Sequence, residues 1–135
     1  CGMKILTVKQ PWASLIIHGG KDIENRQWWT GIRGRIGIHS SAKLEKAECE
    51  DALALLRSIG GKDASLPLVG RDLGSIIGTV EVVDCVRRSN SPWFVGYYGF
   101  VLRNPIALPE PIKVRGQLGW WDYPLEHAMT GGHDA

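Results

Sequence analysis

The segment 20–29 constrains the fold most, because it reads as a short strand yet places charged and aromatic side chains close together. With the two-residue period of a strand, one face carries two acids, a base and an indole: Asp22, Glu24, Arg26 and Trp28. Burying such groups together costs free energy unless polar partners meet them. We therefore expect this strand to border a cleft or a ligand rather than a hydrocarbon core.

The chain has 135 residues, of which 44% are hydrophobic and 22% charged, as in an ordinary soluble domain. We expect one domain over residues 3–128, with an expression remnant at 1–2 and a flexible tail at 129–135. No apolar run approaches the length of a membrane span, and no basic-then-apolar leader precedes the first strand. These features predict a cytoplasmic protein.

The net charge of +2 does not by itself indicate a nucleic-acid binder, because the basic residues fall in pairs in separate segments. Cys49 and Cys85 are too few and too far apart for a disulfide framework, and the histidines show no metal-ligand spacing with them. Phosphate-binding and dinucleotide-binding glycine motifs are absent from the sequence. The sequence therefore predicts no metal and no cofactor.

Two helices are expected in the first half of the chain. The first covers 12–18, with Pro11 opening it, Trp12 in the core, and a glycine pair ending it. The second covers 43–59, with serines before it as capping residues and an apolar stripe along one face. Its early acids suit the positive end of the helix dipole.

Strand patterns are spread over the whole chain. Besides 20–29, the apolar and alternating segments are 5–8, 35–39, 76–86, 97–102 and 106–108. Gly78 suggests a bulge, and the prolines near the last segment predict an edge or broken strand. Five to six mixed strands with two early helices predict an α+β fold built on a small barrel.

Several motifs occur in a fixed order. They are Gln-Pro-Trp-Ala at 10–13, Gly-Lys-x-x-Glu-x-Arg-x-Trp at 20–28, and Arg-Gly at 33–34 before Ile-His at 38–39. Trp-Phe-x-Gly-x-Tyr-Gly-Phe-Val-Leu at 93–102 and Gly-Gln-Leu-Gly-Trp-Trp at 116–121 follow. Together they resemble the ASCH domain (activating signal cointegrator homology) from about residue 5 to 121.

The resemblance implies a small β-barrel related to the PUA domains, which bind RNA, with a nucleic-acid cleft beside the first helix. A few small bacterial relatives are amidohydrolases that remove the acetyl group from acetylcytidine with a lysine, a threonine and a glutamate. Lys21 fits the lysine position, whereas Glu24 stands where the threonine would be. The third position has no assigned residue.

The sequence predicts a domain that binds RNA or a modified nucleoside in one polar, basic cleft. Lys21, Glu24 and Arg26 would form the floor, and Trp28 an aromatic wall. The phosphate side would carry His39, Ser41 and Lys43 at a strand-to-helix junction, and Gln117 would read a base edge. Lys21 and Glu24 would be catalytic only in an enzyme.

Several of these residues also have a structural explanation. Glu24 and Arg26 can pair with each other, which contributes roughly 0–1 kcal/mol at an exposed site. Lys21 follows a helix and complements its C-terminal dipole. Two adjacent strand tryptophans, Trp28 and Trp29, point to opposite faces, so one of them lies near the surface, where it stacks a base or contacts a protein.

Two other functions stay open beside nucleic-acid binding. One is an amidohydrolase acting on an acylated nucleoside, and the other is a protein-interaction module anchored by exposed tryptophans. The sequence leaves open the oligomeric state and the base recognised.

Overall fold

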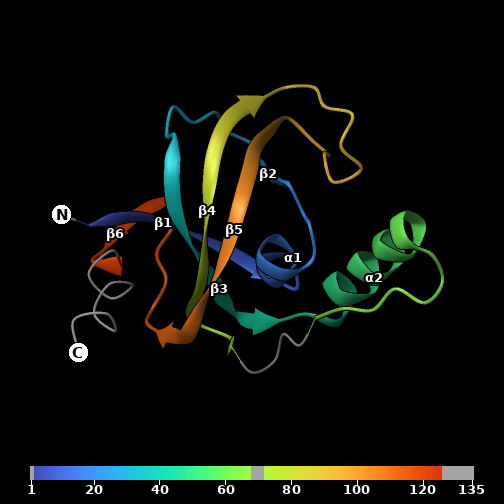
Figure 1. Ribbon diagram of the computed structural model, residues 1–135, viewed down its shortest axis with the longest axis horizontal. Coiled ribbons are helices and arrows are strands. Elements are labelled where there is room, and N and C mark those ends of the chain that lie inside the picture. The colour runs from blue at the N-terminus through green and yellow to red at the C-terminus, as the bar shows by residue number, and fades with distance from the viewer. Residues whose placement is uncertain (1, 68–71, 126–135) are drawn as a thin grey trace.

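The fold consists of one six-stranded mixed sheet and two helices, in a computed structural model that describes residues 2–67 and 72–125 (Figure 1). The strands are β1 (Met3–Gln10), β2 (Ile23–Arg26), β3 (Gly34–Leu44), β4 (Ser75–Val86), β5 (Tyr98–Lys113) and β6 (Trp120–Tyr123). The helices are α1 (Trp12–His18) and α2 (Lys46–Gly60). This confirms the predicted α+β class with both helices in the first half.

The sheet has the order β2-β5-β4-β3-β1-β6, with β1 and β3 parallel and every other pair antiparallel. Its two edges, β2 and β6, are not hydrogen-bonded to each other, so the described strands do not close into a barrel. The predicted closed barrel is therefore not confirmed. Figure 1 shows β3, β4 and β5 as long, curved neighbours, with α1 beside the sheet and α2 beyond it.

Helix α1 is buried on nearly every side, as its apolar sequence predicts. Ala13, Leu15 and Ile16 are at most 1% exposed, and they pack against residues of the sheet such as Phe100 and Ile23. Each large aliphatic side chain buried in this way contributes about 1.5–3 kcal/mol. Leu15 packs in one cluster with Ile23, so α1 helps to place the start of β2 against the core.

The boundary between β3 and α2 differs from the prediction. β3 continues to Leu44, and α2 begins at Lys46, with Glu45 as a cap residue that makes no side-chain capping bond. Ser40 does not cap the helix, because its buried hydroxyl donates to the carbonyls of Asp72 and Ser75 instead. The apolar stripe of α2 is buried at Ala52, whereas Ile59 is 46% exposed.

β5 is one continuous strand where two short ones were predicted. Asn104 bridges them with a positive φ of 54°. The prolines after it are tolerated because β2 pairs only with the Tyr98–Val101 part, so β4 is the one described strand that pairs with the rest. The predicted irregularity at Gly78 is confirmed by a register shift, and a Cβ there would lie 2.6 Å from the Ile106 carbonyl oxygen.

Two other expectations concern the ends of segments. β2 spans only Ile23–Arg26, so the predicted strand 20–29 is too long at both ends. The predicted tail at 129–135 lies outside the described residues. No helix in the described ranges is long and apolar enough to cross a membrane.

Candidate functional site

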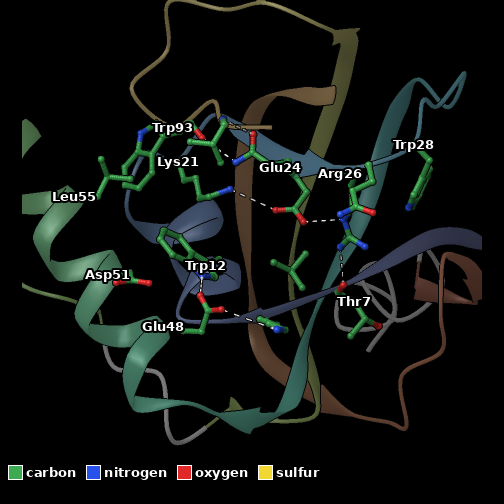
Figure 2. A pocket seen from close by; sticks show the side chains of 15 residues that line it. Thr7, Trp12, Lys21, Glu24, Arg26, Trp28, Glu48, Asp51, Leu55 and Trp93 are labelled. Atoms are coloured by element: carbon green, nitrogen blue, oxygen red, sulfur yellow. Dashed lines mark hydrogen bonds and ion pairs between the residues drawn. The ribbon is translucent and has the colours of Figure 1, made fainter. Parts of the chain in front are cut away.

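A cavity of about 800 Å³ opens between the sheet and α2, where β1, β2, α1 and the β4–β5 loop meet (Figure 2). β1 contributes Thr7, and β2 contributes Glu24 and Arg26. α2 bounds one side with Glu48, Asp51 and Leu55, and Trp28 stands at the opposite side. We call it the first cavity. It contains the predicted floor and the predicted aromatic wall.

A chain of charged groups crosses the first cavity. The Lys21 ammonium lies 3.4 Å from Glu24 Oε1 and donates to the Ile23 carbonyl. Arg26 Nε donates to Glu24 Oε2 at 2.9 Å, and its Nη2 donates to the Thr7 carbonyl at 2.8 Å. Lys21 and Glu24 are only 5% and 7% exposed. The strand period therefore placed Glu24 and Arg26 on one face, and Glu24 joins the two cations.

Burial lowers the pKa of Lys21 below its ordinary value of 10.5, although the Glu24 carboxylate opposes this by favouring the ammonium. Arg26 adds a smaller lowering effect on the same pKa. The sequence does not reveal how deeply Lys21 is buried, and this burial is the main cause of its lowered pKa.

Three tryptophans line the first cavity: Trp12, Trp28 and Trp93. Trp12 was expected in the core, but it is only partly buried, and its indole N–H donates to Glu48 Oε2 at 2.7 Å. Trp28 is 37% exposed and packs edge-on against Phe100, with ring centroids 5.3 Å apart. The Arg26 guanidinium lies 5.9 Å from the centre of the Trp28 ring.

Trp29 is the more exposed of the adjacent pair, at 59%. β2 has already ended at Arg26, so Trp28 and Trp29 do not alternate as neighbouring strand residues. Trp29 does not line the first cavity, so substitution of Trp29 is a control for substitution of Trp28.

The acids of α2 are functional candidates that sequence reasoning missed. Glu48 and Asp51 lie one turn apart on the helix and line the cavity, with Leu55 a further turn on. The spacing 48, 51, 55 was the available signal, but the helix dipole already explained these acids. Three cations line the cavity, namely Lys9, Lys21 and Arg26, and so do three acids, namely Glu24, Glu48 and Asp51. Their formal charges therefore cancel.

The other predicted site residues gather elsewhere. His39, Ser41 and Gln117 line a second cavity of about 700 Å³, together with Lys113, Arg115 and the backbone between them. Lys43 lines neither cavity. His39 and Ser41 lie within β3, so the predicted helix start beside them is wrong. Thr7 lines both cavities and is the residue at which they meet.

A hydrogen-bonded relay joins Thr7 to the wall of the second cavity. Trp121 Nε1 donates to the Thr7 hydroxyl at 3.1 Å, and that hydroxyl lies 3.2 Å from His39 Nδ1. His39 Nε2 lies 2.7 Å from the Val114 carbonyl, which only accepts, so Nε2 carries the proton and Nδ1 accepts from Thr7. Burial lowers the pKa of His39, and the carbonyls of Val114 and Gly74 partly offset this.

The described part of the chain holds no cluster of three or more metal-ligating His, Cys, Asp or Glu side chains. Cys49 and Cys85 are both free thiols, and each is partly buried.

Comparison with known proteins agrees with the motif order. The family model for the ASCH domain matches residues 6–97. The human protein "Activating signal cointegrator 1" is 31% identical over 130 residues, and the mouse protein of the same name is 29% identical over 125 residues. Each alignment covers 86% of this chain but only 21% of the relative, so the chain spans about a fifth of their length. The predicted resemblance is thus confirmed: the chain belongs to the ASCH domain family.

Proposed function

We propose that this domain binds single-stranded RNA by taking one nucleobase, plain or modified, into the first cavity. The observation that carries the proposal is a cavity of about 800 Å³ in which tryptophans surround a buried Lys21–Glu24–Arg26 chain. Ligand pockets in proteins typically enclose about 300–1,000 Å³, with few polar groups among aromatic walls.

The polar groups of the cavity match the edge of a nucleobase. Lys21 and Arg26 are donors, whereas Glu24, Glu48 and Asp51 are acceptors, and the two kinds line the same space. Base edges combine donors and acceptors in the same way. Trp28 offers an exposed indole for stacking, which is the usual means of holding an unpaired base.

The cancelling charges of the first cavity favour a neutral base over a phosphate. A phosphate would bring its negative charge beside Glu48 and Asp51, whose carboxylates would repel it. The family resemblance to PUA-related RNA-binding domains supports the same class of ligand. The relatives are named activating signal cointegrator 1, and a nucleic-acid partner for this domain is compatible with that name.

Adjacent tryptophans provide a matched test. Labelled single-stranded RNA would be titrated by fluorescence anisotropy against the unmodified protein, Trp28→Ala and Trp29→Ala. Loss of one stacked base costs about 1–3 kcal/mol, so Trp28→Ala should weaken binding by about 5- to 150-fold. Trp29→Ala should leave binding unchanged, and circular dichroism would confirm that both variants fold. Equal weakening by the two variants, or by Trp29→Ala alone, would refute the proposal.

A second function is favoured by one specific observation, the lowered pKa of the buried Lys21. A neutral amine can act as a base or a nucleophile, as an amidohydrolase requires. In the hydrolysis of acetylcytidine, water adds to the acyl carbonyl, the C–N bond breaks, and cytidine and acetate are released. Lys21 would take the proton from water and return it to the amino nitrogen of cytidine as the C–N bond breaks, and Glu24, hydrogen-bonded to Lys21, would stabilise the ammonium in between.

The hydrolase hypothesis is tested by incubating the protein with acetylcytidine and following cytidine by mass. Lys21→Met keeps the aliphatic volume of the side chain and removes the amine. Product from the unmodified protein and none from the folded variant would establish the activity. Equal product from both would exclude Lys21 as the base, and no product from either would leave binding as the function.

A further inference from the structure

We infer that the second cavity is a phosphate subsite for the same RNA strand whose base occupies the first cavity. This inference rests on the proposed function. It assigns a role to Lys113 and Arg115, which no motif of the sequence singled out. The first cavity would bind a base and the second a phosphate of the same RNA.

The second cavity differs from the first in its charge. Lys113 and Arg115 line it, and none of its described lining residues is acidic. Elsewhere in the described chain, Arg26 and Arg35 are each paired with a carboxylate, Glu24 and Glu81 respectively. Lys113 and Arg115 have no carboxylate partner among the residues that the structure describes, which is the condition for attracting a phosphate.

The two cations are also free to meet a ligand. The Arg115 guanidinium makes no ion pair or hydrogen bond with other described residues, and Lys113 Nζ contacts only the Leu73 carbonyl, at 3.3 Å. Both residues are exposed. Ser41 and Gln117 add uncharged hydrogen-bond donors to the same lining. Arginine, lysine, serine and glutamine are all used to contact the phosphates of nucleic acids.

Close packing holds this cationic segment at the rim of the cavity. A Cβ on Gly116 would lie 2.7 Å from His39 Cε1 and 2.8 Å from Thr7 Oγ1, so only glycine allows the segment to approach so near. His39 donates to the carbonyl of Val114, between the two cations in sequence. The segment that carries Lys113 and Arg115 is thereby anchored to β3.

Thr7 makes the two cavities parts of one surface. Its carbonyl accepts from Arg26 in the first cavity, while its hydroxyl contacts His39 in the second. An RNA that inserts a base beside Arg26 would have its backbone near Thr7, and Thr7 also lines the positively charged second cavity.

The test compares Lys113→Ala/Arg115→Ala with Lys62→Ala/Arg88→Ala, which removes the same charge from exposed positions outside both cavities. Binding of a short single-stranded RNA would be measured over a range of salt concentrations, and a nucleoside would be titrated separately. Each lost phosphate contact should lower the salt slope by about 0.7, so one or two contacts reduce affinity about 5- to 25-fold at 0.1 M salt. The control variant should keep the wild-type slope, and nucleoside binding should be the same in all three proteins.

Three results would overturn the inference. The first is an unchanged slope and affinity in Lys113→Ala/Arg115→Ala while Trp28→Ala still weakens RNA binding, which leaves the proposed function standing. The second is an equal loss in the control variant. The third is inorganic phosphate that binds the unmodified protein and not Lys113→Ala/Arg115→Ala, yet does not compete with the RNA at constant ionic strength, which would make the cavity a free-anion site. Absence of any RNA binding by the unmodified protein would overturn the proposed function itself and this inference with it.

Discussion

Replacing Glu24 with glutamine tests the energetic reading of the first cavity, because Glu24 is the only carboxylate in the described structure that pairs with Lys21 and Arg26. The substitution keeps the shape of the side chain and removes its charge. Lys21, whose side chain is 4% exposed, is then left without a counter-charge.

Removing one member of a buried ion pair typically costs about 3–5 kcal/mol. The glutamine oxygen can still accept one hydrogen bond, and Arg26 keeps the Thr7 carbonyl, so we expect a loss of about 2–4 kcal/mol at pH 7. Glu24 raises the pKa of Lys21, and its removal lowers that pKa further.

The pH dependence of Glu24→Gln follows from this lowered pKa. Between the lowered folded pKa of Lys21 and its ordinary value of 10.5, the unfolded chain binds more protons than the folded protein, so the stability of Glu24→Gln rises with pH in that window. The deficit relative to wild type should accordingly shrink as the pH rises towards 10.5.

Urea unfolding followed by tryptophan fluorescence at several pH values measures this directly. Glu50→Gln is the matched control, because its pair with Lys46 is exposed and should contribute no more than about 0.5 kcal/mol. Lys21→Met/Glu24→Gln should recover part of the loss, since it removes the unpaired charge. A cost below about 0.5 kcal/mol at pH 7, or a cost that does not change with pH, would show that the buried charge chain is not as described.

Three further predictions concern the cavity walls. The folding stability of the unmodified protein should fall as the pH drops below about 6.5, because burial lowers the pKa of His39 in the folded protein. His39→Gln should flatten this acid slope in urea titrations, and an unaltered slope would contradict the burial of a neutral His39. Gly116→Ala should lower the free energy of unfolding by about 1–3 kcal/mol and weaken RNA binding, whereas Gly60→Ala, with no atom closer than 3.7 Å to the added carbon, should leave thermal unfolding unchanged. Equal stability of the two variants would contradict the close approach of Gly116 to His39 and Thr7. Trp12→Phe should cost about 1–3 kcal/mol of stability by leaving Glu48 without the indole donor. Glu48→Gln should then cost less stability in the Trp12→Phe background than in the wild type, and strictly additive effects in thermal melts would refute the hydrogen bond.

Local signals in the sequence predicted much of the fold. Pro11 and the glycine pair at 19–20 fixed α1 at 12–18, because proline favours a first turn and Gly20 takes the left-handed φ of 77°. The predicted start of the second helix was wrong because the Ser40 hydroxyl can either cap a helix or form a hydrogen bond with another strand. Only the tertiary contact with Ser75 decides between them.

The candidate site was predicted where one strand alone determines it. The period of β2 placed Glu24 and Arg26 together, and both line the first cavity. The split into two cavities was not predictable, because it depends on how β1 lies between distant segments. Glu48 was missed for the same reason: its contact with Trp12 spans 36 residues of sequence.

The most direct test of the central claim uses the six tryptophans as reporters. Indole N–H signals of nitrogen-15-labelled protein would be followed by nuclear magnetic resonance while a short single-stranded RNA is added. Binding of a base in the first cavity predicts that the signals of Trp12, Trp28 and Trp93 move together, while that of Trp29 stays in place. Saturating RNA that leaves these three signals unmoved, or that shifts Trp29 alone, would contradict the account.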